Sequence, residues 1–116
     1  MIKTIAKIFL SLMLLTSVAF ADERFTEVRA SHILVKTANE AMQIKKEIDN
    51  GGDFEYYARI YSICPSAQNG GDLGYFGRGQ MVPEFERKAF TLPVGVVSDP
   101  VFSPFGWHLI KVTDRR

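Results

Sequence analysis

The sequence has little of what several common protein classes require. Cysteine occurs once, as Cys64, which excludes an internal disulfide and any CxxC redox or zinc-ribbon motif. Charge of one sign is not in excess either, because 14 Lys+Arg face 13 Asp+Glu and the net charge is +1. Without a basic cluster, a nucleic-acid-binding surface is not expected. Only two histidines are present, and the 116 residues suffice for one small domain.

The one long apolar run lies at the N-terminus. Lys3 and Lys7 precede an apolar stretch over residues 8–18, and Ala19-Phe20-Ala21 follows. This pattern predicts a secretory signal peptide over residues 1–21, cleaved after Ala21. An uncleaved anchor is the alternative, although the stretch is shorter than the ~20 apolar residues of a spanning helix. Cleavage would leave 95 residues with 12 basic and 13 acidic side chains, a near-neutral soluble domain.

The predicted mature chain starts with a polar, flexible segment over residues 22–27. Residues 28–35 then alternate between two faces, which predicts a strand. Thr37 and Glu40 match a capping box, in which the hydroxyl accepts from the Glu40 amide, and this predicts the start of a helix.

Turn and capping residues predict two more helices. Asn50-Gly51-Gly52 ends the first helix, and Asp53 can cap a second one whose apolar residues recur over 54–61. The glycine-rich stretch 64–81 predicts turns around one short aromatic strand. A third helix is expected from Pro83 to Leu92, with proline in its first turn.

The C-terminal part predicts two strands, a short one around residues 96–98 and a longer one over 107–113, separated by a turn at 103–106. The order is thus strand, helix, helix, strand, helix, strand, strand. This order favours an α+β fold with a small, largely antiparallel sheet and helices packed around it.

Few polar residues that could carry chemistry fall on the apolar strand faces. His32 lies between Ala30 and Leu34, and His108 shares its face with apolar neighbours. Neighbouring end strands would bring both rings together, although each could equally be a satisfied core residue. Cys64 is either a small buried hydrophobe or a thiol near the histidines, acting as a nucleophile or zinc ligand. No short metal-ligand spacing supports zinc.

The glycines over residues 70–81 do not predict a phosphate loop, because the Gly-Lys-Ser/Thr ending is absent. Large apolar residues surround these turns, and they either fill the core or line a groove. They are Leu73, Met81, Phe85, Phe102 and Phe105.

Several motifs in order resemble the parvulin-type peptidyl-prolyl cis/trans isomerases, in particular the minimal single-domain bacterial parvulins. The motifs are Ser31-His32-Ile33-Leu34-Val35-Lys36, Cys64-Pro65-Ser66, Gly70-Gly71-Asp72-Leu73-Gly74, Gly79-Gln80-Met81-Val82-Pro83, and Phe105-Gly106-Trp107-His108-Leu109-Ile110-Lys111-Val112. The resemblance implies a parvulin domain over residues 28–114 with a four-stranded antiparallel sheet surrounded by helices.

The resemblance also implies site residues. It assigns active-site roles to His32, Cys64, Ser103 and His108, and a proline pocket to Leu73, Met81, Phe85 and Phe102. Position 103 is commonly threonine in the family, and the serine here offers the same hydroxyl to a histidine.

The resemblance implies an isomerase that needs no cofactor or metal and acts on proline-containing, unfolded, exported polypeptides. Phospho-specificity is not expected, because the loop 36–39 holds one lysine. With the signal, it points to a monomer in a bacterial periplasm, with neither membrane nor nucleic acid bound. A chaperone-like module that binds extended exported chains with little isomerase activity is the alternative. A Cys/His hydrolase lacks an orienting acid or nucleophile elbow.

Overall fold

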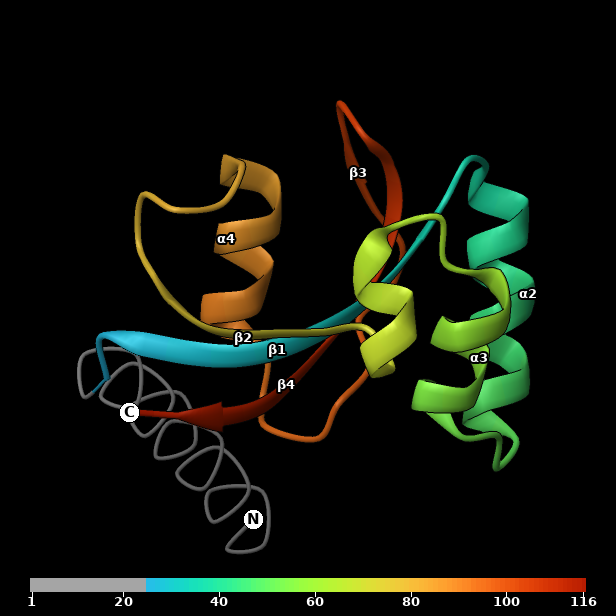
Figure 1. Ribbon diagram of the computed structural model, residues 1–116, viewed down its shortest axis with the longest axis horizontal. Helices are drawn as coiled ribbons and strands as arrows, with labels where there is room; N and C mark the ends of the chain where they lie inside the picture. Colours follow the sequence, from blue (N-terminus) through green and yellow to red (C-terminus); the bar gives the residue numbers. More distant parts are fainter. Residues whose placement is uncertain (1–24) are drawn as a thin grey trace, which may run out of the picture.

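A computed structural model describes residues 25–116, which form one antiparallel sheet with helices on both of its faces (Figure 1). The sheet has four strands in the order β2-β1-β4-β3. Their bounds are β1 Glu27–Val35, β2 Asp72–Gly77, β3 Val101–Ser103 and β4 Gly106–Arg115. The predicted α+β class with a four-stranded antiparallel sheet is therefore confirmed.

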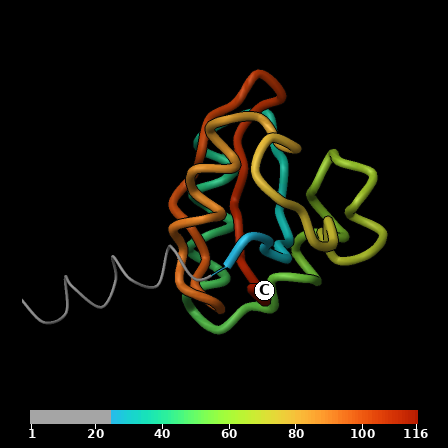
Figure 2. The backbone as a smooth tube through the Cα atoms, turned by 90° about the vertical axis from the view of Figure 1, so that its left-hand side faces the viewer, coloured from blue at the N-terminus to red at the C-terminus, as the bar shows by residue number. Residues whose placement is uncertain are grey.

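The helices divide between the two faces of the sheet. α2 (Ala38–Asp49) and α3 (Phe54–Tyr61) lie on one side of it and α4 (Pro83–Thr91) on the other (Figure 1). In Figure 2 the molecule is seen from the α4 side, with α4 in front of α2. A short 3-10 helix, η1 (Pro65–Asn69), connects α3 to β2.

Local signals explain where the helices begin. The Thr37 hydroxyl accepts a hydrogen bond from the Glu40 amide at 3.2 Å, as the capping box predicts. The Asp53 carboxylate accepts from the Tyr56 amide at 3.3 Å and starts α3. Proline at the first position opens α4, where an amide hydrogen would have no partner in the helix.

β1 is one of the two inner strands of the sheet, and its alternating side chains contribute to the cores on both faces. Val28 and Ala30 pack under α4 with Phe90 and Ile110. The alternate residues, such as Ile33, face α2 and α3. Each fully buried Val, Ile or Phe side chain contributes about 1.5–3 kcal/mol to the stability of the fold. A sheet buried on both faces therefore stabilises a domain that has no disulfide.

The segment before β3 differs from the prediction. A strand was expected around residues 96–98, but only one bridge forms there, between Val97 and Lys111. The Ser98 hydroxyl accepts the Ile110 amide hydrogen at 2.9 Å, in the place of a backbone carbonyl. Pro100 follows and has no amide hydrogen to donate, so regular pairing resumes only at β3. The 3-10 helix η1 was not predicted either.

The first described residues make contacts with the rest of the domain. Phe25 stacks on Phe90 with ring centroids 5.7 Å apart, and the Thr26 amide donates to the Arg116 carbonyl at 3.0 Å. The flexibility expected for residues 22–27 stays a prediction. The predicted signal peptide and its cleavage site after Ala21 lie outside the described residues. Within residues 25–116, every helix falls short of the length and apolarity needed to cross a membrane.

One glycine allows β2 to approach β1 closely. The amide of His32 donates to the carbonyl of Gly71 at 2.9 Å. Gly71 has φ +88°, and a Cβ there would lie 2.3 Å from the His32 carbonyl oxygen. This contact fixes the backbone of His32 where β1 leaves its regular pairing with β2.

Gly71→Ala is expected to destabilise the fold more than Gly74→Ala. Both positions have positive φ, so each substitution strains the backbone by ~1–3 kcal/mol. Only Gly71 adds a collision, because nothing lies within 4 Å of a Cβ at Gly74. Urea unfolding should show an extra loss of about 2 kcal/mol for Gly71→Ala. Equal losses in the two variants would contradict the close approach.

Candidate active site

Two histidines meet on the α4 side of the sheet. His32 comes from β1 and His108 from β4, and they are diagonal neighbours because His32 pairs with Ile110 and Leu34 pairs with His108. Their Nδ1 atoms lie 3.0 Å apart, and their rings stack with centroids 5.2 Å apart. Both side chains are buried, with 5% and 3% exposure. The structure therefore brings together the two histidines, as expected if the first and last strands are neighbours.

A third polar side chain extends this pair. Ser103, the last residue of β3, lies with its hydroxyl 2.6 Å from Nε2 of His108. The same hydroxyl accepts the amide hydrogen of Phe105 at 3.1 Å, which fixes the oxygen in the turn between β3 and β4. A hydrogen-bonded chain thus runs from this turn through His108 to His32.

Burial keeps the pair uncharged. Burial, with a smaller contribution from the nearby His108, lowers the pKa of His32 to about 4. Burial also lowers the pKa of His108. The Phe85 ring meets both imidazoles edge-on, with centroids 5.5 Å from His32 and 5.3 Å from His108. Both rings are therefore neutral at neutral pH, and an aromatic side chain covers them.

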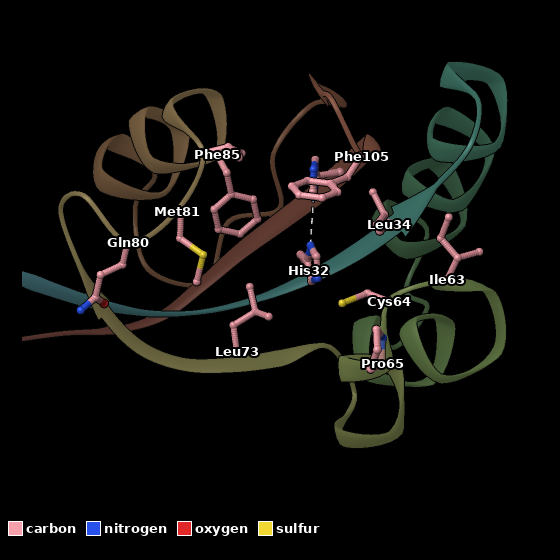
Figure 3. Close-up of a pocket in the computed structure, with 12 residues that line it drawn as sticks. His32, Leu34, Ile63, Cys64, Pro65, Leu73, Gln80, Met81, Phe85 and Phe105 are labelled. Atoms are coloured by element: carbon pink, nitrogen blue, oxygen red, sulfur yellow. Dashed lines mark hydrogen bonds between the residues drawn. The ribbon is translucent and has the colours of Figure 1, made fainter.

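An open cavity of about 520 Å³ lies over the pair. Its walls are mostly apolar and come from β1, the α3–η1 connection, η1, β2, the start of α4 and the β3–β4 turn (Figure 3). The lining residues are His32, Leu34, Ile63, Cys64, Pro65, Leu73, Gln80, Met81, Val82, Phe85, Phe105 and His108. Three of the four residues expected in a proline pocket, Leu73, Met81 and Phe85, line it together.

Phe102 was expected in the pocket and is not there. Its side chain is 60% exposed and packs on Trp107, with centroids 5.1 Å apart. The register of β3 explains this, because Phe102 pairs with Trp107, whereas Val101 pairs with His108. Alternation then turns Ser103 toward His108 and Phe102 to the opposite face. Phe105, for which the sequence left core and groove open, lines the pocket.

Cys64 lies on the pocket wall and is half-buried. Its sulfur points toward His32 in Figure 3. The connection before it is tied to β1, because the Leu34 amide donates to the Ser62 hydroxyl at 3.0 Å and the Ile63 amide donates to the Leu34 carbonyl at 2.9 Å. This pairing places the thiol on the same wall as His32 (Figure 3). Within residues 25–116, the two side chains are not hydrogen-bonded to each other.

Two other pocket residues, Leu34 and Ile63, were not predicted from the sequence as site residues. The sequence places Leu34 in a strand and Ile63 in a connection, and the hydrogen bond between their backbones brings both to the pocket. Their one sequence signal is proximity to His32 and Cys64. Over residues 25–116, no three side chains of the His, Cys, Asp and Glu types are grouped as metal ligands would be.

The arrangement suits binding chemistry more than bond-breaking chemistry. It offers a mostly apolar cavity, a neutral and aligned polar pair, and a thiol without a hydrogen-bonded base. A nucleophile of the hydrolase type needs a base within hydrogen-bond reach. The cavity size lies within the range of small-ligand sites.

The sequence matches the family model of the PPIC-type PPIase (rotamase) domain over residues 25–114. It is 52% identical over 98 residues to the foldase protein PrsA of Geobacillus kaustophilus, an alignment that covers 84% of this chain and 35% of that protein. The chain therefore spans about a third of the length of the curated relatives that it matches.

Solved structures agree with the sequence match. The peptidyl-prolyl isomerase PrsA from Bacillus anthracis superposes with a TM-score of 0.78 at 50% identity, over 79% of this chain and 43% of that one. NmPin, the parvulin of Nitrosopumilus maritimus, gives 0.71 at 43% identity, over 77% of this chain and 97% of that one. With a family model matched over nearly all of the described residues and the same fold in these structures, the chain belongs to the PpiC-type, or parvulin, family of peptidyl-prolyl isomerases.

Proposed function

We propose that this chain accelerates the cis/trans isomerisation of X-Pro bonds in exported, folding proteins, without forming a covalent intermediate. The observation that carries the proposal is the apolar cavity with a neutral, hydrogen-bonded histidine pair at its base. Family membership supports the same reaction.

The reaction needs a suitable environment more than a reactive group. Resonance gives the amide C–N bond double-bond character, and rotation about it costs about 18–20 kcal/mol. The planar amide is strongly polar, and the twisted amide has lost its conjugation. An apolar cavity withdraws water from the planar amide and so favours the less polar twisted state in relative terms. Leu73, Met81 and Phe85 supply the apolar wall that would hold the prolyl ring during rotation.

Counting hydrogen bonds assigns protons within the pair. Ser103 accepts from the Phe105 amide, so its own hydrogen has a partner only if it donates to Nε2 of His108. His108 then carries its hydrogen on Nδ1 and donates to Nδ1 of His32. His32 is left with a hydrogen on Nε2, an atom that is buried and has no partner within the described residues. The opposite direction would leave the serine hydrogen without an acceptor as well.

This assignment gives the histidine pair a task. An unpartnered buried donor costs about 1–3 kcal/mol. We infer that the neutral, hydrogen-bonded pair fixes the polarity beside the cavity, and that this fixed polarity suits the twisted amide better than the planar one. Cys64 would then line the path of the rotating carbonyl without bonding to it.

We also infer where the domain acts. The predicted signal peptide over residues 1–21 supports export, and a bacterial periplasm fits that signal. The substrates would be proline-containing segments of unfolded or partly folded exported polypeptides.

Met81→Ala is expected to lower kcat/KM for a proline peptide about tenfold, because it removes part of the apolar wall. A protease that cleaves only the trans peptide provides the assay. Met42→Ala is the matched control, since Met42 is 60% exposed on α2 and outside the pocket. Unchanged kinetics in a folded Met81→Ala variant would contradict the pocket. Binding of extended chains without turnover by the wild type would favour the chaperone-like alternative instead.

Cys64→Ala is expected to retain at least about a tenth of the wild-type kcat/KM, because isomerisation breaks no bond and needs no nucleophile. Cys64→Asp should behave similarly if the residue only shapes the polarity beside His32. The same assay measures both variants, with circular dichroism as the check on folding. Complete loss of activity with an intact fold would point to a covalent role and overturn the proposal.

Activity should depend on the neutral form of the histidine pair. Since the pKa of folded His32 is lowered to about 4, kcat/KM should stay level from neutral pH down to about 5 and fall toward 4. Unfolding should become easier over a wider range, because the unfolded chain takes up this proton near 6.5 and the folded one near 4. NMR titration of the imidazoles measures the pKa. Protonation of His32 near 6.5 in the folded state would contradict the assignment.

A further inference from the structure

The pocket wall that would hold the prolyl ring comes partly from a helix and partly from a connection. Phe85 belongs to α4, whereas Gln80 and Met81 belong to the segment 78–82 between β2 and α4, which lies outside the helices and strands. Figure 3 shows Met81 on this segment and Phe85 on the helix, close together on the same side of the cavity. The width of the ring pocket therefore depends on how the segment 78–82 is held against α4.

The carboxylate of Glu86 ties this segment to the helix. One of its oxygens, Oε1, accepts the amide hydrogen of Gly79 at 2.6 Å. The other, Oε2, lies 3.9 Å from Nη1 of the Arg78 guanidinium. A hydrogen bond to an ionised acceptor is about twice as strong as one between neutral groups. The Gly79 contact therefore closes a loop over residues 79–86, and Met81 lies within that loop.

The place of Glu86 on α4 explains how it can hold the segment without entering the cavity. It directly follows Phe85, and its amide donates to the Val82 carbonyl at 3.0 Å in the first turn of the helix. Successive residues of a helix point about 100° apart, so Phe85 reaches the histidines while Glu86 reaches back to Gly79. The Glu86 side chain is 20% exposed and does not line the cavity. Its effect on a substrate would therefore pass through the segment that carries Met81.

Other side-chain contacts of the segment 78–82 are local or exposed. The Gln80 side-chain oxygen accepts the Gly77 amide hydrogen at 3.0 Å, which tightens the turn after β2 but does not join it to α4. The Arg78 guanidinium lies over the Phe90 ring, 4.2 Å from its centroid, and the Arg78 side chain is 58% exposed. Exposed ion pairs and exposed cation–π contacts contribute modestly. The hydrogen bond from Gly79 is therefore the firmer attachment of the segment to the helix.

We propose that Glu86 is a positioning residue of the isomerase. Its carboxylate holds Gly79 so that Met81 stays against Phe85 and the ring pocket keeps its width. This inference rests on the proposed isomerase function and adds a residue that acts on it from outside the cavity.

Glu86→Ala should raise KM for a proline peptide about fivefold and leave kcat nearly unchanged, because a loosened wall weakens binding of the planar and twisted amides alike. A variant that is only less well folded would lower kcat with the folded fraction and keep KM. Glu86→Gln retains a side-chain oxygen for the Gly79 amide, so its KM should lie within about twofold of the wild type. Arg87→Ala, at the next and exposed position of α4, is the control and should keep both constants. An unchanged KM in Glu86→Ala, or an equal rise in Glu86→Gln, would overturn the proposal.

A double variant tests whether Glu86 acts through Met81. In a chain that already carries Met81→Ala, adding Glu86→Ala should lower kcat/KM by less than about twofold, because the side chain that Glu86 keeps in place is gone. Independent effects would multiply and give a further loss of about fivefold. That result would contradict the positioning role.

Arg78→Ala distinguishes the two contacts of the carboxylate. It should change KM by less than about twofold, since the exposed ion pair contributes little and the Gly79 contact remains. A KM as high as that of Glu86→Ala would assign the effect to the ion pair and overturn the role of the Gly79 amide. Absence of turnover by the wild type would overturn the isomerase function itself, whereas normal turnover with an unchanged KM in Glu86→Ala overturns the positioning role alone.

Discussion

One hydrogen bond between two imidazoles sets the conditions for the rest of this site. The Nδ1 atoms of His32 and His108 are 3.0 Å apart, so one must carry a hydrogen and the other must not. Two protonated rings would place two donors and two charges against each other. The contact therefore excludes a hydrogen on both Nδ1 atoms at once, and burial under Phe85 further disfavours charge on either ring. The apolar cavity and the polar pair depend on each other.

The face of the sheet away from the pocket gives the pair its rigidity. Ile33 and Val35 alternate with His32 along β1 and pack against α2 and α3, where they are almost fully buried. A close-packed interior holds a strand within fractions of an ångström. Because α2 and α3 hold β1 from one face of the sheet, the pocket on the other face can remain open while the histidines stay in place. Gly71 adds a backbone hydrogen bond to His32 itself.

Sequence periodicity predicted much of this arrangement, because its signals are local. Alternation in β1 and β4 placed His32 and His108 each on an apolar strand face, and Thr37 and Asp53 marked where helices begin. The pairing of β1 with β4 then brings the two faces together. Local periodicity did not predict the position of β3. The Ser98 hydroxyl, and not a backbone carbonyl, accepts the Ile110 amide hydrogen, and this tertiary contact delays the start of β3 to Val101.

The exchange of Phe102 for Phe105 follows from the same limit. In a strand, a shift of one residue turns every side chain to the other face. The short β3 carries no alternation long enough to fix its own register, and its pairing with β4 decides it. The pocket residues contributed by connections, such as Ile63, depend likewise on pairing between distant segments.

The absence of charge around the cavity also constrains how the domain meets its substrates. A lining without Asp, Glu, Lys or Arg gives no long-range attraction, so contact is made by apolar surface at short range. Such binding is modest, and that suits isomerisation of a folding chain. Tight and equal binding of the cis and trans forms would slow release without lowering the barrier, whereas preference for the twisted amide alone lowers it. A small apolar pocket over a neutral histidine pair meets this requirement with few residues.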